Sequence, residues 1–497
     1  MRAISLLLCL GLLTVLLCGC GEQPPAASDP PEVSTSHTET GDGYGLPYAD
    51  EGVFDPLTTE NALNIYLTPL VYRSLFVREA DMALSPSLAS DYSLEGSNVR
   101  VTLRGDTVFH NGVALTAEDV VYSCSRILKG DNPRFADLRE KITAVRAEGQ
   151  NTLLFTLAEG VSSWMDVLTF PIVRKGTGVT EDAVGCGDYA LRTSEGKRYL
   201  SAVGGESSLQ DLPFSRIELV PVKSISGLVD AFEAGRVDCM AADVLSWESF
   251  MPVCTYSVQS APTGLANILL FNTENALLSD ASLRGALSAL LPREELCAGP
   301  LLGAATASQD WMYGGVPCVD APAESEAKEI LASAGFGGEN PVRFTLLYCN
   351  DRWQRGEEAR RLADWLSGLG AECELRGLES GKYEKALEKG DFDLAIVRRP
   401  LRDAEELAAL CTREGAYNFT GYRNDEMEAE LRVLRLSERD TAAEAEAEVS
   451  RMLSEDTPFA VIGYENIRVY FRDGGVSAFS PLPDCPYGNP ARWRIDE

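Results

Sequence analysis

The chain has 497 residues, 45% of them hydrophobic and 24% charged, proportions that are normal for a globular protein. Its 44 basic and 75 acidic residues give a formal net charge of −31, which repels nucleic acid and anionic lipid headgroups and argues against a nucleic-acid partner. The simplest role of this acidity is solubility, with attraction of cationic ligands as the alternative. The length suffices for two or three domains, each with its own core.

A leader occupies the start of the chain. Arg2 precedes an apolar run over residues 3–17, which is too short for a transmembrane helix and has the length of a signal-peptide core. The run ends in the sequence LCGC, which resembles the bacterial lipobox. This resemblance implies removal of a signal peptide of residues 1–19 and a diacylglycerol thioether on Cys20. We therefore expect an extracytoplasmic protein that is lipid-anchored to the outer face of the cell membrane or lies in the periplasm.

Residues 20–43 form a polar segment behind the leader. Beyond Cys20 the segment is rich in Pro, Ser, Thr, Glu and Gly and has almost no apolar residues. It cannot bury enough surface to offset the entropy lost on ordering. We predict a lipidated, disordered tether that ends where the folded part begins, near Tyr44.

The first part of the folded chain mixes strands and helices. Residues 98–103 alternate as a strand does, and residues 151–157 form a second candidate strand. Between them, Thr116 is the predicted N-cap of a helix that runs to about Leu128, with acidic residues in its first turn.

A strand–helix–strand unit follows. The strands are predicted over residues 216–222 and 236–241, and the helix over residues 224–234, with Ser224 as its cap and Gly235 at its end. This spacing predicts a parallel βαβ crossover.

A longer unit of the same kind occurs later. Its strands are predicted over residues 342–349, 372–376 and 392–397, and its helices over residues 357–369 and 382–388. Two α/β regions imply two lobes, and a cleft between lobes is a common place for a ligand.

Ten cysteines lie beyond Cys20: Cys124, Cys186, Cys239, Cys254, Cys297, Cys318, Cys349, Cys373, Cys411 and Cys485. They form no CxxC pair, so we interpret most of them as buried small hydrophobic side chains. Cys349 ends one predicted strand and Cys373 begins the next, which places them at opposite ends of parallel neighbours and predicts no bridge between them. Other disulfide pairings stay open.

Motifs for catalysis and metal binding are missing from the sequence. The only histidines are His37 and His110, and there is no HExxH, GxSxG or Walker motif. Ser194 and Lys197 match SxxK, but they lie among Gly and charged residues, which favours a surface turn. We therefore predict no catalytic residue, no metal site and no cofactor.

Residues 103–126 (LRGDTVFHNGVALTAEDVVYSCSR) carry a family resemblance. They are similar to the signature of the family 5 solute-binding proteins, the peptide- and nickel-type receptors of ABC importers. Further matches follow in the expected order at residues 51–56 (the family's N-terminal cleft strand), 234–238, 270–272, 283–287 and 418–424.

The resemblance implies an α/β, two-lobed periplasmic-binding-protein-like fold of type II, with mixed sheets flanked by helices and two hinge crossings, near Ala266 and Gly474. The implied parts are lobe I at residues 44–56, 168–265 and 475–497, an extra subdomain at residues 57–167, and lobe II at residues 266–474.

The resemblance also implies a function without catalysis. The protein would capture a ligand, by family default an oligopeptide, in the cleft between lobes and deliver it, as a monomer, to an ABC permease. The ligand-binding residues implied or suggested by their position are Glu51, Asn272, Arg398, Arg399, Asp403 and Tyr417.

One departure from the family pattern affects the ligand. Peptide-binding relatives place an Asp that pairs with the peptide α-amino group where this chain has Pro400, while Asp403 matches a second acidic position. Three arginines stand nearby, at Arg398, Arg399 and Arg402, and such a cluster favours a carboxylate or phosphate. The alternative is that these arginines face solvent. Two other functions stay open, a transport-independent sensor or adaptor and an exported hydrolase.

Overall fold

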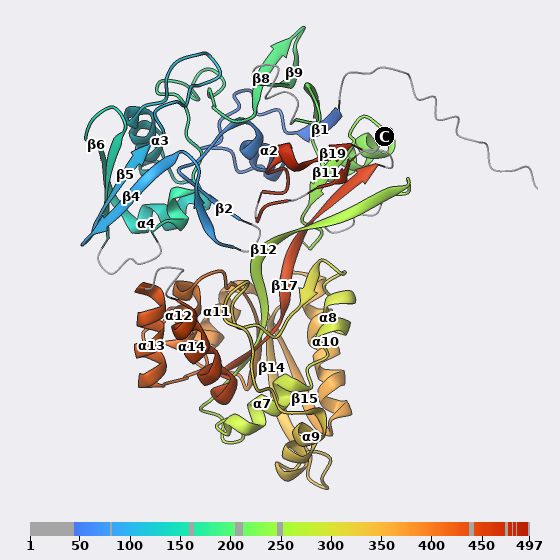
Figure 1. Ribbon diagram of the computed structural model, residues 1–497. Coiled ribbons are helices and arrows are strands. Elements are labelled where there is room, and N and C mark those ends of the chain that lie inside the picture. The colour runs from blue at the N-terminus through green and yellow to red at the C-terminus, as the bar shows by residue number, and fades with distance from the viewer. Residues whose placement is uncertain are drawn as a thin grey trace, which may run out of the picture. The chain divides into compact units, whose positions relative to one another are not determined.

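The computed structural model describes residues 44–79, 82–158, 164–203, 212–245, 252–436, 442–472, 476–479, 481–483 and 485–495 (Figure 1). The predicted signal peptide, Cys20 and the tether lie outside these residues. Within these ranges, no helix has both the length and the apolar character needed to cross a bilayer.

A four-stranded sheet begins the folded part. Its strands are β1 (Tyr44–Tyr48), β8 (Tyr189–Ser194), β9 (Lys197–Ala202) and β10 (Arg216–Pro221). The order is β1-β10-β9-β8, with β1 parallel to β10 and the other pairs antiparallel. Ser194 and Lys197 close the β8–β9 hairpin, and the two residues between them have positive φ angles of 51° and 75°, as a type I′ turn requires. The predicted surface turn is confirmed.

A second four-stranded sheet is antiparallel throughout. Its strands are β4 (Ala89–Glu95), β5 (Asn98–Leu103), β6 (Ile142–Ala147) and β7 (Thr152–Leu157), in the order β4-β5-β7-β6. Helix α3 (Ala117–Lys129) packs on β6 and β7. Its first turn is closed by a capping box between Thr116 and Asp119, which confirms the predicted start of this helix. Nearby lie α4 (Ala136–Lys141) and the short hairpin of β2 (Phe76–Arg78) and β3 (Leu84–Pro86).

The largest sheet has the order β11-β17-β12-β16-β14-β15, with β13 (Ala305–Ala307) also paired to β17. Its other strands are β11 (Cys239–Ala242), β12 (Tyr256–Phe271), β14 (Val342–Cys349), β15 (Ala371–Leu378), β16 (Leu394–Pro400) and β17 (Phe459–Arg472). Strand β14 is parallel to both β15 and β16. The crossovers are α10 (Trp353–Gly368) and α11 (Ser380–Glu388), so the predicted second α/β unit is confirmed.

The remaining elements are mostly helices. They are α2 (Ala62–Val71), α6 (Ile225–Glu233), α7 (Ala281–Ala289), α8 (Arg293–Ala298), α9 (Glu324–Ser333), α12 (Ala404–Cys411), α13 (Asp425–Leu436) and α14 (Ala443–Asp456), with a small pair of strands, β18 (Val476–Ala478) and β19 (Arg494–Ile495). Helices α12, α13 and α14 pack together beside the large sheet (Figure 1).

The long strands β12 and β17 run side by side for most of their length (Figure 1). Their register shifts between Pro262 and Ala266, where Gly264 has a φ of +67°. This irregularity coincides with the first predicted hinge crossing at Ala266, whereas Gly474 lies outside the described residues. The predicted domain boundaries stay a prediction.

Two local predictions were wrong. Strands β10 and β11 belong to different sheets rather than to one βαβ crossover, because β1, from far earlier in the chain, pairs with β10, and its Gly45 accepts a 2.9 Å hydrogen bond from Asp238 N just before β11. Residues 51–56 are not a strand either. Strand β1 ends at Tyr48, and the chain then bends at Gly52, which has a φ of +81°.

The cysteines from Cys124 to Cys411 are free thiols, half-buried or fully buried. Register confirms the prediction for Cys349 and Cys373, because Cys349 pairs with Leu378 and Cys373 with Phe344, at opposite ends of the β14–β15 ladder. Burial raises the pKa of Cys124 and of Cys297 to about 12.

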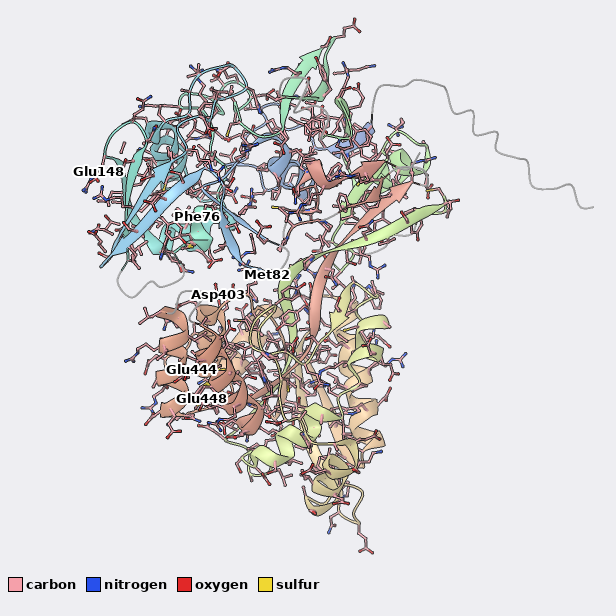
Figure 2. All side chains as sticks on the ribbon, viewed as in Figure 1. Phe76, Met82, Glu148, Asp403, Glu444 and Glu448 are labelled. Carbon is pink, nitrogen blue, oxygen red and sulfur yellow. The ribbon has the colours of Figure 1, made fainter. Side chains whose placement is uncertain are left out.

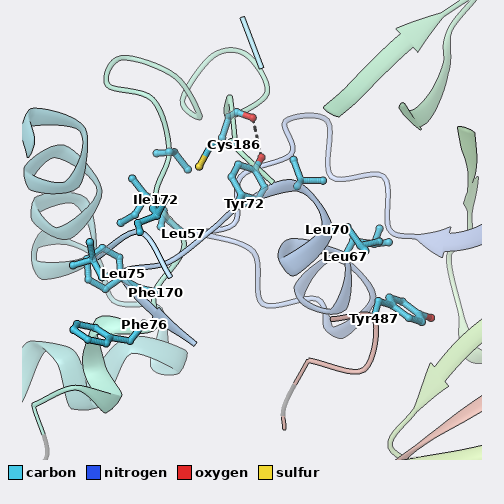
Figure 3. Close-up of a cluster of buried hydrophobic side chains, with 14 of the residues drawn as sticks. Leu57, Leu67, Leu70, Tyr72, Leu75, Phe76, Phe170, Ile172, Cys186 and Tyr487 are labelled. Atoms are coloured by element: carbon cyan, nitrogen blue, oxygen red, sulfur yellow. Dashed lines mark hydrogen bonds between the residues drawn. The ribbon is translucent and has the colours of Figure 1, made fainter. Parts of the chain in front are cut away.

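Close backbone packing supports the core around α2 (Figure 3). There Tyr72 donates its hydroxyl to Ala183 O at 2.8 Å. Gly187 N donates to Val71 O at 2.8 Å, and a Cβ atom added at Gly185 would lie 2.1 Å from the same oxygen. These two glycines let the segment before β8 lie directly on the end of α2.

We predict that Gly185→Ala destabilises the fold by about 2 kcal/mol or more, because the added methyl group meets backbone that cannot move aside. Gly368→Ala is the matched control, since no atom of the described residues lies within 4 Å of its added Cβ at the end of α10, and it should be neutral or stabilising by at most about 1 kcal/mol. Urea denaturation of both variants measures the difference. Equal midpoints would contradict the prediction.

Candidate ligand-binding site

The parallel strands β14, β15 and β16 end together at Cys349, Leu378 and Pro400, and we call this side of the sheet the carboxyl edge. Helix α10 begins four residues after β14, and α12 begins four residues after β16. In open α/β sheets, ligands bind outside the carboxyl ends of the strands, because loops and helix starts there present polar groups. We therefore expect a ligand-binding site at the carboxyl edge.

A buried carboxylate lies beside this edge. Glu465 on β17 is 3% exposed. Its Oε1 accepts hydrogen bonds from Asn267 Nδ2 on β12 at 3.0 Å and from Arg398 Nε on β16 at 2.8 Å, and its Oε2 pairs with Arg398 Nη2. One carboxylate thus ties together three neighbouring strands of the sheet.

Helix α10 adds a second ion pair to the same network. Arg355 Nη1 donates to Asn267 Oδ1 at 2.7 Å and to Glu358 Oε2 at 2.9 Å, while Arg355 Nη2 lies 4.0 Å from Glu465 Oε1. Burial lowers the pKa of Arg355, but Glu358 and Glu465 together raise it above its ordinary value. We call Asn267, Arg355, Glu358, Arg398 and Glu465 the Glu465 network.

Glu358 is the fully buried ionisable member of this network. Burial raises the pKa of its carboxyl group, and the opposing effect of Arg355 is smaller. Its Oε1 has no hydrogen-bond partner in the described part of the chain.

The three arginines of the carboxyl edge have different surroundings. Arg398 pairs with Glu465, and Arg402 pairs with Glu406, with Nε 3.1 Å from Oε1. Arg399 lies between them in sequence and forms no ion pair with a described residue. Its guanidinium carbon lies 4.4 Å from the centre of the Tyr417 ring.

Asp403 begins α12 rather than standing free at the edge. Asp403 is labelled in Figure 2. Its Oδ1 accepts a hydrogen bond from Glu406 N at 2.9 Å, which makes it the N-cap of the helix. It also lines a cavity of about 230 Å³ with Arg402, Arg435 and Glu446.

Two other predicted site residues lie elsewhere. Glu51 follows β1, and its Oε2 accepts hydrogen bonds from Thr59 Oγ1 at 2.7 Å and Asn64 Nδ2 at 2.9 Å. Asn272 follows the last residue of β12, far along that strand from Ala266, the partner of Arg399. The structure thus brings Arg399 and Tyr417 into contact and leaves Asn272 at the other end of the sheet. Ligand contact by the six residues stays a prediction.

Several residues of the family-like motifs hold loops in place. Arg284, which is 4% exposed, donates to backbone oxygens of Leu278, Asp456 and Thr457. Asn418 donates to the backbone oxygens of Thr412 and Tyr422. Both motifs join the chain near the end of the sheet where Asn272 lies, since Leu270 pairs with Phe459 and Thr273 N donates to Thr420 O.

Of the five residues of the Glu465 network, only Arg398 was predicted from the sequence as a site residue. Arg355 and Glu358 have the i, i+3 spacing of a helical ion pair, a signal that was present. Asn267 and Glu465 lie 198 residues apart, and nothing in the sequence marks them as partners. In the described ranges, no three His, Cys, Asp or Glu side chains are grouped so that they could hold a metal ion.

The family model for bacterial extracellular solute-binding proteins, family 5 Middle, matches residues 83–412. The chain therefore belongs to family 5 of the bacterial extracellular solute-binding proteins. The resemblance inferred from the motifs is confirmed.

Individual relatives are distant in sequence. The chain is 22% identical over 386 residues to the periplasmic murein peptide-binding protein MppA of Escherichia coli K12, covering 68% of this chain and 71% of that protein. It is 20% identical over 519 aligned positions to the oligopeptide-binding protein AppA of Bacillus subtilis 168, covering 93% of each.

Solved structures confirm the predicted fold class. The unliganded open form of MppA matches with a TM-score of 0.74 at 19% identity, over 91% of this chain and 97% of that one. A nickel ABC transporter protein from Bacillus halodurans matches with a TM-score of 0.75 at 20% identity, over 91% and 99%. The fold is the α/β fold of type II periplasmic binding proteins.

Removing Arg355, one of the two cations of the Glu465 network, tests the contribution of the network to stability. We predict that Arg355→Met costs about 3–5 kcal/mol, because Glu358 is then buried without a cation. Arg360→Met on the same helix is the control, since Arg360 is exposed and its ion pair among the described residues is with Glu357, and it should cost less than about 1 kcal/mol. Chemical denaturation of both variants gives the comparison. Similar losses would show that the network contributes no more than a surface pair.

The raised pKa of Glu358 predicts a pH dependence. Between the ordinary carboxyl pKa of 4.5 and the higher folded value, the folded state keeps a proton that the unfolded state has lost. Stability from this group therefore falls as pH rises through that window. Glu358→Gln should remove this contribution, so the variant gains stability relative to the wild type as pH rises above the ordinary carboxyl pKa of 4.5. Parallel stability curves for the two proteins would refute the assignment.

Proposed function

We propose that this protein is an extracytoplasmic receptor that captures an oligopeptide and delivers it, chemically unchanged, to an ABC permease. Membership of family 5 supports the receptor role. The names of two relatives, a murein peptide-binding protein and an oligopeptide-binding protein, support the choice of ligand.

The observation that carries the peptide proposal is an unpaired strand edge. Strand β16 pairs with β12 over all the residues of β16, from Leu394 to Pro400. On the other side, β14 pairs only with Leu394 and Ala395. Five residues of β16, 396–400, therefore pair with a described strand on one side only. Two of their backbone oxygens accept side-chain hydrogen bonds, Ile396 O from Tyr383 Oη at 2.6 Å and Arg398 O from Arg399 Nη1 at 3.0 Å, which a bound strand would have to replace.

Such an edge suits an extended peptide. Backbone N–H and C=O groups along an open strand edge can accept a further strand, so that main-chain hydrogen bonds give affinity whatever the side chains of the peptide are. The edge lies at the carboxyl ends of the parallel strands, where ligands of open α/β sheets bind. Arg399 and Tyr417 lie at its end.

Native mass spectrometry of the mature chain with pools of short synthetic peptides tests this function. We expect complexes of one peptide per chain, and peptides released from them with unchanged masses. Uptake of a bound peptide that is lost when the receptor is deleted would support delivery to a permease. Absence of any peptide complex would overturn the peptide ligand, and shortened peptides would overturn a purely binding role.

We infer a lipid anchor on Cys20, and the sequence LCGC supports it. Cys20→Ser removes the thiol that would carry the diacylglycerol, so the variant should leave the membrane fraction and lack the mass of the lipid. Cys124→Ser is the matched control, because Cys124 is a buried thiol within α3 and should leave anchoring unchanged. Membrane fractionation and intact-mass measurement report the result. A Cys20→Ser protein that still carries lipid would refute the anchor.

A further inference from the structure

One arginine of the carboxyl edge has no carboxylate partner among the described residues. Arg398 is neutralised by Glu465 and Arg402 by Glu406. The neighbouring carboxylates are also engaged, since Asp403 caps α12 and Glu405 pairs with Arg435, with Oε2 2.7 Å from Nη2. Arg399 is the arginine of this cluster that lacks a carboxylate partner among the described residues.

The surroundings of Arg399 hold its guanidinium in place. Its Nη1 donates to the backbone oxygen of Arg398 at 3.0 Å, and the group lies over the Tyr417 ring at 4.4 Å. A guanidinium on an aromatic face is stabilised by the ring quadrupole and keeps its in-plane N–H groups available for hydrogen bonds. Because Tyr417 is 39% exposed, the pair is reachable from solvent.

A second observation points to a missing partner. Arg399 Nε is buried and has no hydrogen-bond acceptor in the described part of the chain. Leaving a buried charged donor unsatisfied is costly, and protein structures rarely do so without a functional reason. An acceptor with two oxygens, such as a carboxylate or phosphate, matches the fork of guanidinium donors.

We propose that Arg399, held over Tyr417, binds an anionic group of the ligand, either a carboxylate or a phosphate. This inference rests on the proposed function and deepens it. A negatively charged group of the ligand is bound at the end of β16. Pro400 at this end has no carboxylate that could bind an amino group. Its source in a peptide is the terminal carboxylate or an acidic side chain.

Peptides with modified ends separate these possibilities. The probes are short synthetic peptides without charged side chains, each with free ends, an acetylated amino end or an amidated carboxyl end, and an amidated form that contains one Glu. Calorimetry with the wild-type chain should show that amidation weakens binding by about tenfold to a hundredfold, the loss of a charged hydrogen bond, while acetylation has little effect. Recovery by the Glu-containing form would assign the anion to a side chain.

Variants then place the effect on Arg399. Arg399→Ala should weaken binding of the free-ended peptide by about tenfold to a hundredfold. The variant should then bind the free-ended peptide and the amidated peptide with equal affinity. Arg399→Lys should recover part of the affinity, and Tyr417→Leu should weaken binding while Tyr417→Phe does not. Arg360→Ala, an exposed arginine of α10, is the control, and melting temperatures show that each variant is folded.

The outcomes distinguish this inference from the function on which it rests. Wild-type affinity in folded Arg399→Ala, or loss of binding on acetylation instead of amidation, would overturn the anionic anchor and leave the peptide receptor standing. If no peptide form binds, the proposed peptide ligand is wrong. The ligand that co-purifies with the wild-type chain then decides: an anionic compound lost from Arg399→Ala supports the anchor, and a compound without an anionic group refutes it.

Discussion

The buried carboxylate of Glu465 is the interaction on which the candidate site depends. It receives hydrogen bonds from Asn267 on β12 and Arg398 on β16, and it belongs to β17, so it fixes three strands at the level where the sheet ends. Arg355 brings the start of α10 to the same place. A buried charge is tolerated only where its hydrogen bonds and counter-ions are complete, which makes the geometry of this corner specific.

That geometry also determines what the neighbouring arginines can do. A cluster of three guanidinium groups looks in the sequence like one strongly positive patch. In the structure, Arg398 and Arg402 belong to internal ion pairs, and their charge is cancelled locally. The positive potential offered to a solute is therefore concentrated at Arg399, within a protein whose overall charge is −31.

Much of the fold could be predicted because its signals are local. The capping box at Thr116, the hairpin between Ser194 and Lys197, and the strands and helices between residues 342 and 400 are all encoded by nearby residues. The order of strands was harder. The place of β1 beside β10 depends on a segment about 170 residues earlier in the chain, and no periodicity reports such a pairing.

The candidate site was only partly predictable for a related reason. The sequence identified Arg398, Arg399 and Tyr417, because they follow a predicted strand or stand beside a family-like motif. The sequence could not distinguish the ion-paired Arg398 from Arg399, since the partner of Arg398 lies 67 residues away, on β17. Asn272 was selected by its motif, yet it donates to the backbone oxygens of Gly390 and Phe392, which is a structural role.

The thiols have a consequence for how the protein is made. Burial raises the pKa of Cys124 and Cys297 to about 12, so almost no reactive thiolate is present at neutral pH. No bond between the thiols from Cys124 to Cys411 has to form before the core can pack. This part of the chain therefore does not require oxidative folding enzymes. The same structure should form in the reducing cytosol of an expression host and outside the cell.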